Sequence, residues 1–129
     1  MLSLQKLRGR KEVDKELKEI LNGVWGVIGL IPDDWEVAKY VKMLKRLKPV
    51  LEKEFKVSKV GVFGSFVRNE QTKNSDIDIL VEFSEHIGLK FIDLIEFLEE
   101  KLGRKIDLVP EDAISPYIKP YVKREVIYI

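Results

Sequence analysis

The chain of 129 residues has no cysteine and a single histidine, His86. Disulfide bonds, thiolate metal centres and zinc sites built from histidines are therefore excluded. Long hydrophobic runs are also missing, because the longest, Val24 to Ile31, has eight residues, whereas a bilayer-spanning helix needs about 20. No apolar segment of a secretory signal follows the basic N-terminal residues. We therefore expect a cytoplasmic protein with no membrane partner.

Charge of one sign does not dominate the sequence either. The net charge is +1, although residues 1–57 carry a net +4 and residues 58–129 a net −3. Neither half is basic enough to predict nucleic acid as a direct ligand. The basic half is either a solvated helix surface or a docking face for an acidic partner. Trp25, in the same half, either packs on its own domain or anchors a partner.

The spacing of apolar residues predicts helices in the first half of the chain. One is expected over Glu12 to Leu21 and a second over residues 35–57. Pro49 is expected to kink the second helix or to begin a new one near Lys48, because proline lacks the backbone N–H that a helix interior uses.

Strand and helix patterns alternate in the second half. Strands are predicted at residues 60–63, 76–83 and 105–109, a short helix at 66–70, a longer one at about 88–102, and a last helical segment from 110 to about 124. This alternation predicts an α/β or α+β domain. Three tyrosines near the end, Tyr117, Tyr121 and Tyr128, are expected to pack in the core or at its edge, with contact or self-modification as alternatives.

Three aspartates form the first candidate constellation. Asp76 and Asp78 are two residues apart on a predicted strand, so both carboxylates leave the same face. Side by side they repel, and a divalent cation would offset that repulsion; oxygen-only ligands favour Mg²⁺ or Mn²⁺. Asp107 interrupts another apolar strand. If the two strands are neighbours, three carboxylates can hold two metals about 3.5–4 Å apart, as in displacement at phosphorus.

The Gly64-Ser65 pair supplies the second part of the candidate site. It follows a predicted buried strand and precedes a predicted short helix. Glycine lets the backbone approach a phosphate closely, and a helix start would present free N–H groups. Ser65 adds a hydroxyl donor, and Arg68 can offset phosphate charge or close the loop.

Together these residues resemble a known signature. The segment "GVFGSFVRNEQTKNSDIDILVEF" is similar to the active-site motif of DNA-polymerase-β-like nucleotidyltransferases, and more narrowly of the minimal nucleotidyltransferases, in which G-S, ten residues and D-x-D follow one another. The later "KIDLV" around Asp107 fits the third carboxylate, and the resemblance covers residues 58–129. This family commonly has Arg-Gly-Glu where this chain has Arg68-Asn69-Glu70. Asparagine tolerates left-handed backbone angles, so we expect the turn to persist.

The resemblance implies a nucleotidyltransferase fold, a small mixed β-sheet flanked by helices. Residues 1–57 would be an N-terminal helical extension and residues 58–129 the minimal nucleotidyltransferase domain. It further implies Mg²⁺-dependent transfer of AMP from ATP to a tyrosine of a HEPN-domain toxin, with the chain as antitoxin and a hetero-oligomer as the assembly. The implied roles are Asp76 and Asp78 as ligands of two Mg²⁺ ions, Asp107 as ligand of the catalytic ion and proton acceptor, Gly64 and Ser65 as holders of the β- and γ-phosphates, and Arg68 as a phosphate counter-charge.

Two other functions stay open at the level of sequence. The chain could be an antitoxin that inhibits by binding alone, although a complete set of three acids argues against this. It could also modify a small hydroxylated molecule, an activity for which related enzymes usually carry an added acceptor-binding domain. A polymerase is not expected, because 129 residues leave no room for a template-binding arm.

Overall fold

The computed structural model describes residues 31–129, and both the helix predicted over Glu12 to Leu21 and Trp25 lie outside this range. The described elements are α3 (Glu36–Phe55), β1 (Val57–Phe63), η2 (Gly64–Phe66), β2 (Ile77–Phe83), α4 (Lys90–Leu102), β3 (Ile106–Pro110), η3 (Glu111–Ala113), α5 (Lys119–Glu125) and β4 (Ile127–Tyr128). The predicted mixed α/β class and the three predicted strands are confirmed.

The strands form one mixed sheet in the order β3-β2-β1-β4. Strand β1 pairs antiparallel with β2 and β4, whereas β2 and β3 are parallel. A parallel pair needs a long crossover, and α4 provides it between β2 and β3. As a result, the end of β1 and the beginnings of β2 and β3 lie at the same edge of the sheet.

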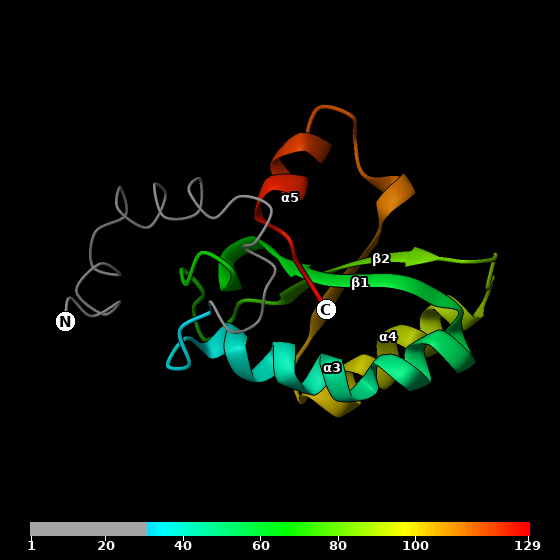
Figure 1. The fold of residues 1–129 in the computed structure, drawn as a ribbon, viewed down its shortest axis with the longest axis horizontal. Helices are drawn as coiled ribbons and strands as arrows, with labels where there is room; N and C mark the ends of the chain where they lie inside the picture. The colour runs from blue at the N-terminus through cyan, green and yellow to red at the C-terminus, as the bar shows by residue number, and fades with distance from the viewer. Residues whose placement is uncertain (1–30) are drawn as a thin grey trace.

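Helices cover the two faces of the sheet unequally. Figure 1 shows α3 and α4 side by side on one face and the short α5 on the other. The larger core lies under α3 and α4, where Ile77, Ile79 and Val81 of β2 meet Leu44 of α3 and Leu98 of α4. Alternate residues of a strand point to opposite faces, so Asp78 and Leu80 face α5 instead.

A smaller core lies between the sheet and α5. It is formed by Leu80, Val122 and Val126. Gly61 of β1 makes this approach possible, because a Cβ at that position would lie 2.7 Å from Cγ2 of Val126 and 2.9 Å from the carbonyl oxygen of Ile127. The segment after α5 is therefore held close to β1, where the chain continues as the edge strand β4.

One of the two outcomes expected at Pro49, a new helix near Lys48, is wrong, while a kink at this residue stays a prediction. Helix α3 neither ends nor restarts near Lys48 but continues as one element of 20 residues with Pro49 inside it. Proline 49 is exposed, and the burial of residues on both sides of it, including Leu44 and Leu51, holds the helix against the sheet. Tertiary packing therefore outweighs the missing backbone hydrogen bond.

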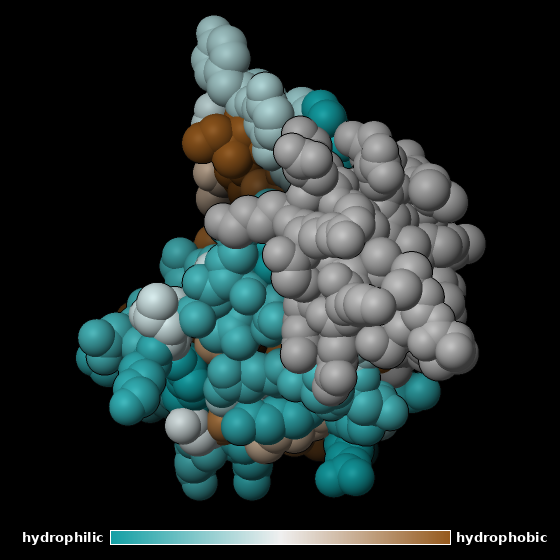
Figure 2. Space-filling model, turned by 90° about the vertical axis from the view of Figure 1, so that its left-hand side faces the viewer, coloured by the Kyte–Doolittle hydropathy of each residue, from teal (hydrophilic) through white to brown (hydrophobic). Residues whose placement is uncertain are grey.

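The last helical segment also differs from the expectation. It is divided into η3 and α5, with residues 114–118 between them. Pro116 explains the break, because proline disfavours helical angles at the residue before it. The packing expected for Tyr117 and Tyr121 is wrong, since they are 86% and 63% exposed. Ile118, between these two tyrosines, is also exposed. Figure 2 shows a brown, hydrophobic patch near the top of the molecule, at the height of this part of the chain.

Within residues 31–129, no helix combines the length and the apolar composition needed to cross a membrane.

Candidate active site

The turn after β1 forms the floor of the candidate site. Gly64 has a φ of +79°, in the left-handed region that glycine favours. A Cβ at Gly64 would overlap the carboxylate of Asp78, because Phe63 and Asp78 are paired across β1 and β2. Both the backbone angle and the close approach of Asp78 therefore require glycine at this position.

The turn is shorter than the sequence suggested. No α-helix begins after Ser65; instead, Gly64–Phe66 forms a single 3-10 turn. The chain then turns back, with the N–H of Glu70 donating to the carbonyl of Ser65 at 2.9 Å. Asn69 has a φ of +56°, so the expected left-handed conformation at this position is confirmed. The predicted helix over residues 66–70, with its dipole, is wrong, and any phosphate-binding groups here come from the turn itself.

Two of the three aspartates lie on neighbouring strands in register. Asp78 of β2 and Asp107 of β3 are paired positions of the parallel ladder, so their side chains leave the same face of the sheet. Asp76 lies two residues earlier, just before β2 begins. Asp76 and Asp107 are exposed, whereas Asp78 is half-buried beside Gly64.

The electrostatics of Asp78 reflect this crowding. Burial, as the largest cause, and the negative charges of Asp107 and then Asp76 together raise the pKa of Asp78 to about 6, against the lowering effect of Arg68. The negative charges of Asp76 and Asp107 thus act on Asp78, and none of the three carboxylates has a hydrogen-bond or ion-pair partner within residues 31–129. A bound cation would offset this repulsion.

The carboxylates suit a hard cation in their chemistry but are not arranged around one as they stand. Their oxygen-only donor set is the kind that Mg²⁺ takes. Within residues 31–129, no group of three or more acidic, histidine or cysteine side chains is placed to hold a metal ion. Side-chain rotation at the exposed Asp76 and Asp107 would be needed to complete a site around Asp78, so the three ligand assignments stay predictions.

Arg68 is engaged by acids of its own chain. Its Nη1 donates to both carboxylate oxygens of Glu125, at 2.9 and 2.7 Å, and its Nε donates to Glu70 at 2.9 Å. The same Glu125 carboxylate accepts the N–H of Gly64 at 3.2 Å. A carboxylate from α5 therefore contacts two of the groups that the sequence assigned to phosphate binding.

Two residues at the site were not identified from sequence. Glu125 reaches Gly64 and Arg68 from 61 and 57 residues away. Arg104, between α4 and β3, binds the loop before Asp76. Neither residue belongs to the G-S or D-x-D pattern, and only the pairing of distant elements brings them to the site.

Family and sequence similarity agree with this geometry. A model of the nucleotidyltransferase domain matches residues 44–129. A relative from Methanocaldococcus jannaschii named as a protein adenylyltransferase is 44% identical over 95 residues, which cover 72% of this chain and 97% of the relative. The protein adenylyltransferase MntA of Thermococcus cleftensis is 47% identical over 83 residues, or 64% of this chain and 84% of that protein.

Solved structures show the same fold. A minimal nucleotidyltransferase structure aligns with a TM-score of 0.60 and 32% identity, covering 69% of this chain and 92% of that one. A mutant toxin–antitoxin MntA-HpeT structure aligns with a TM-score of 0.50 and 24% identity over 70% of this chain and 68% of that one, a likeness of fold alone.

Proposed function

This chain belongs to the nucleotidyltransferase domain family, and we propose that it transfers AMP from ATP to a tyrosine hydroxyl of a partner toxin. The observation that carries the proposal is the register of Asp78 with Asp107 beside the Gly64 turn. The names of the relatives, which are protein adenylyltransferases, support AMP as the transferred group and a protein as the acceptor.

Asp76, Asp78 and Asp107 would hold two Mg²⁺ ions, since they are the acidic side chains at this edge of the sheet. When bound, the metal supplies charge neutralisation for the triphosphate and the departing pyrophosphate. Gly64 and Ser65 hold the β- and γ-phosphates through backbone N–H groups and the Ser65 hydroxyl. Arg68 contributes positive charge to the same phosphates.

The reaction is an in-line displacement. The tyrosine oxygen attacks the α-phosphorus of ATP and forms the new P–O bond, while the bond to pyrophosphate breaks. Asp107 accepts the hydroxyl proton in this proposal, because it is the more exposed of the two paired aspartates. Positioning and charge complementarity supply most of the rate enhancement.

The proposed partner is a HEPN-domain toxin, with this chain as its antitoxin in a hetero-oligomer. Support comes from the sequence signature and from the 47% identical relative, which carries the name MntA that also appears in the toxin–antitoxin structure of the same fold. The acceptor must come from a second molecule, because the described elements are used to build the sheet and the site.

The proposal is tested by incubating the chain with Mg²⁺, α-labelled ATP and the candidate toxin. We expect label on a toxin tyrosine and loss of toxin activity. Asp76→Asn and Asp78→Asn should reduce transfer by about 100-fold or more. Asp93→Asn is the matched control, because Asp93 is exposed on α4, and it should leave transfer within about twofold.

Two results would contradict this proposal and identify another function. Inhibition of the toxin that persists in both aspartate variants, without any transfer of label, would identify an antitoxin that acts by binding alone. Label found only on a small hydroxylated molecule would identify a different acceptor class.

A further inference from the structure

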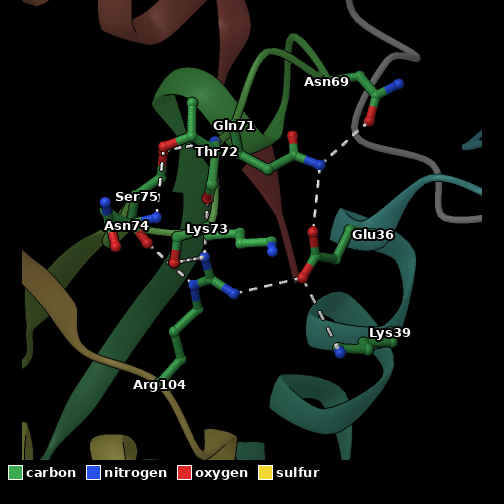
Figure 3. A network of polar contacts seen from close by, with 9 residues as sticks. All are labelled: Glu36, Lys39, Asn69, Gln71, Thr72, Lys73, Asn74, Ser75 and Arg104. Carbon is green, nitrogen blue, oxygen red and sulfur yellow. Dashed lines mark hydrogen bonds and ion pairs between the residues drawn. The ribbon is translucent and has the colours of Figure 1, made fainter.

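Arg104 lies in the turn between α4 and β3, and its guanidinium points into the loop that precedes Asp76 (Figure 3). Its Nε donates to the carbonyl of Ser75 at 2.9 Å, and its Nη2 donates to the carbonyls of Thr72 and Lys73 at 3.0 and 3.1 Å. One side chain thus binds three carbonyl groups within four residues, those of Thr72, Lys73 and Ser75, in a polar loop that has no helix or strand of its own.

The same guanidinium contacts two further elements. Its Nη1 lies 3.3 Å from Oε1 of Glu36, at the start of α3, and its carbon atom lies 4.9 Å from the ring centre of Phe66. Phe66 is fully buried and ends the Gly64 turn. Only 19% of the Arg104 side chain is exposed, so these contacts are made in a largely desolvated position, where hydrogen bonds of a charged donor are strong.

Arg104 therefore contacts or adjoins three segments of the proposed site. It binds the loop that ends at Asp76, stacks on the turn that contains Gly64, and precedes Asp107 by three residues. We propose that Arg104 is a positioning residue that fixes the Asp76 carboxylate relative to Asp78 and Asp107. This inference rests on the proposed function, because it concerns the metal ligands of the same site.

The geometry requires an arginine. A guanidinium is planar and presents five N–H donors in fixed directions, so it can bind three carbonyls and a carboxylate together. A lysine ammonium at the same position would keep the charge but has three donors on one atom, at the end of a flexible stem. Arg104→Lys therefore separates the charge of this residue from its ability to hold the loop.

The test uses the full chain and Mn²⁺ as the probe, with free ion followed by electron paramagnetic resonance. We expect Arg104→Lys to fold and to raise the Kd for Mn²⁺ about tenfold or more, the range seen when residues that orient metal ligands are replaced. The Mg²⁺ concentration needed for half-maximal AMP transfer should rise in parallel. The KM for ATP at saturating Mg²⁺ should change less than about threefold, because the triphosphate groups at Gly64 and Arg68 are untouched.

Lys105→Gln is the matched control, because it removes one positive charge at the next, exposed position without breaking any loop contact. It should leave both metal titrations unchanged. A folded Arg104→Lys variant whose Mn²⁺ affinity equals that of the wild type would overturn the inference. So would a variant that loses affinity for ATP and metal equally with a falling thermal midpoint, since that pattern marks a general loss of structure.

The two proposals fail in different ways. If the wild-type chain binds Mn²⁺ but transfers no AMP, the proposed transfer reaction is wrong. The Mn²⁺ titration of Arg104→Lys still tests the role of Arg104. If Arg104→Lys does not fold, Glu36→Gln decides. It weakens the outer contact of the guanidinium, together with the contacts of Glu36 to Gln71 and Lys39. It should raise the Mn²⁺ Kd by a smaller factor, about two- to threefold, and no change would overturn the inference.

Discussion

Asp78 has the most unfavourable position among the described carboxylates. It is half-buried against the backbone of Gly64, with two further aspartates close enough to affect its ionisation. Burial, followed by the negative charges of Asp107 and Asp76, raises the pKa of this carboxyl from 3.8 to about 6. The residue therefore reduces the stability of the metal-free protein at neutral pH, a pattern common at functional sites.

Asp78→Asn should make the metal-free protein more stable at pH 7, by about 1 kcal/mol once solvent screening is allowed for. Between pH 3.8 and about 6 the folded protein keeps a proton that the unfolded chain has released. The stability of the wild type therefore falls as the pH rises through this window, and that of the variant does not. Urea unfolding at pH 3.5 and pH 7 measures the difference, which should disappear at the lower pH. An equal gain for Asp93→Asn would contradict the explanation.

Glu125 occupies two of the groups that the proposed function assigns to the triphosphate. Its carboxylate accepts the N–H of Gly64 and pairs with Arg68. Glu125→Gln should therefore bind ATP more tightly, by about threefold or more, because a competing negative charge is removed. Titration of ATP without partner protein measures this. Glu111→Gln is the control, since Glu111 pairs with Lys123 away from the Gly64 turn. Weaker ATP binding by Glu125→Gln would instead mean that Glu125 orients Arg68 for the phosphates.

At the scale of elements, periodicity predicts most of the described secondary structure. Ile77, Ile79 and Val81 alternate with Asp78, Leu80 and Glu82 along β2. Gly103 ends α4 in the left-handed conformation. The errors occur at prolines and at the Gly64 turn. Local pattern cannot show that the burial of Leu44 and Leu51 carries α3 through Pro49, or that the chain turns back after Ser65.

Pro49 leaves α3 with a stability defect that a single substitution should remove. Pro49→Ala restores one backbone hydrogen bond, and the helix propensity of alanine is about 3 kcal/mol more favourable. Proline also restricts the unfolded chain, which offsets about 1 kcal/mol of that gain. We expect the free energy of unfolding to rise by about 1–2 kcal/mol in urea titrations. Because Pro49 is exposed, little packing is lost; a decrease in stability would show that its ring contributes to the fold.

At the scale of the whole molecule, the sequence predicts which residues form the site better than it predicts how they are arranged. The spacing of Gly64, Asp76 and Asp78 can be recognised in the sequence. Asp107 can be assigned to the same site only once β3 is placed next to β2. The contributions of Glu125 and Arg104 depend on elements that are 30 to 60 residues apart, and no local pattern encodes such contacts. Whether residues 1–57 form a separate extension stays a prediction.

The packing of α3 bears on that boundary. Its buried residues, including Val37, Val41 and Leu44, belong to the same core as β1 and β2. Burial of each such side chain is worth about 1.5–3 kcal/mol, more in total than the stability of a small domain. We expect a fragment of residues 58–129 to show no cooperative thermal transition, whereas the full chain shows one. Cooperative unfolding of the fragment would place the boundary at residue 57.

Helix α5 has seven residues, or about two turns. Tyr121 is an exposed residue of this helix. Glu125, one turn later, accepts the N–H of Gly64 and pairs with Arg68. A protein bound against Tyr121 would therefore lie within one helical turn of the residue that contacts Gly64 and Arg68.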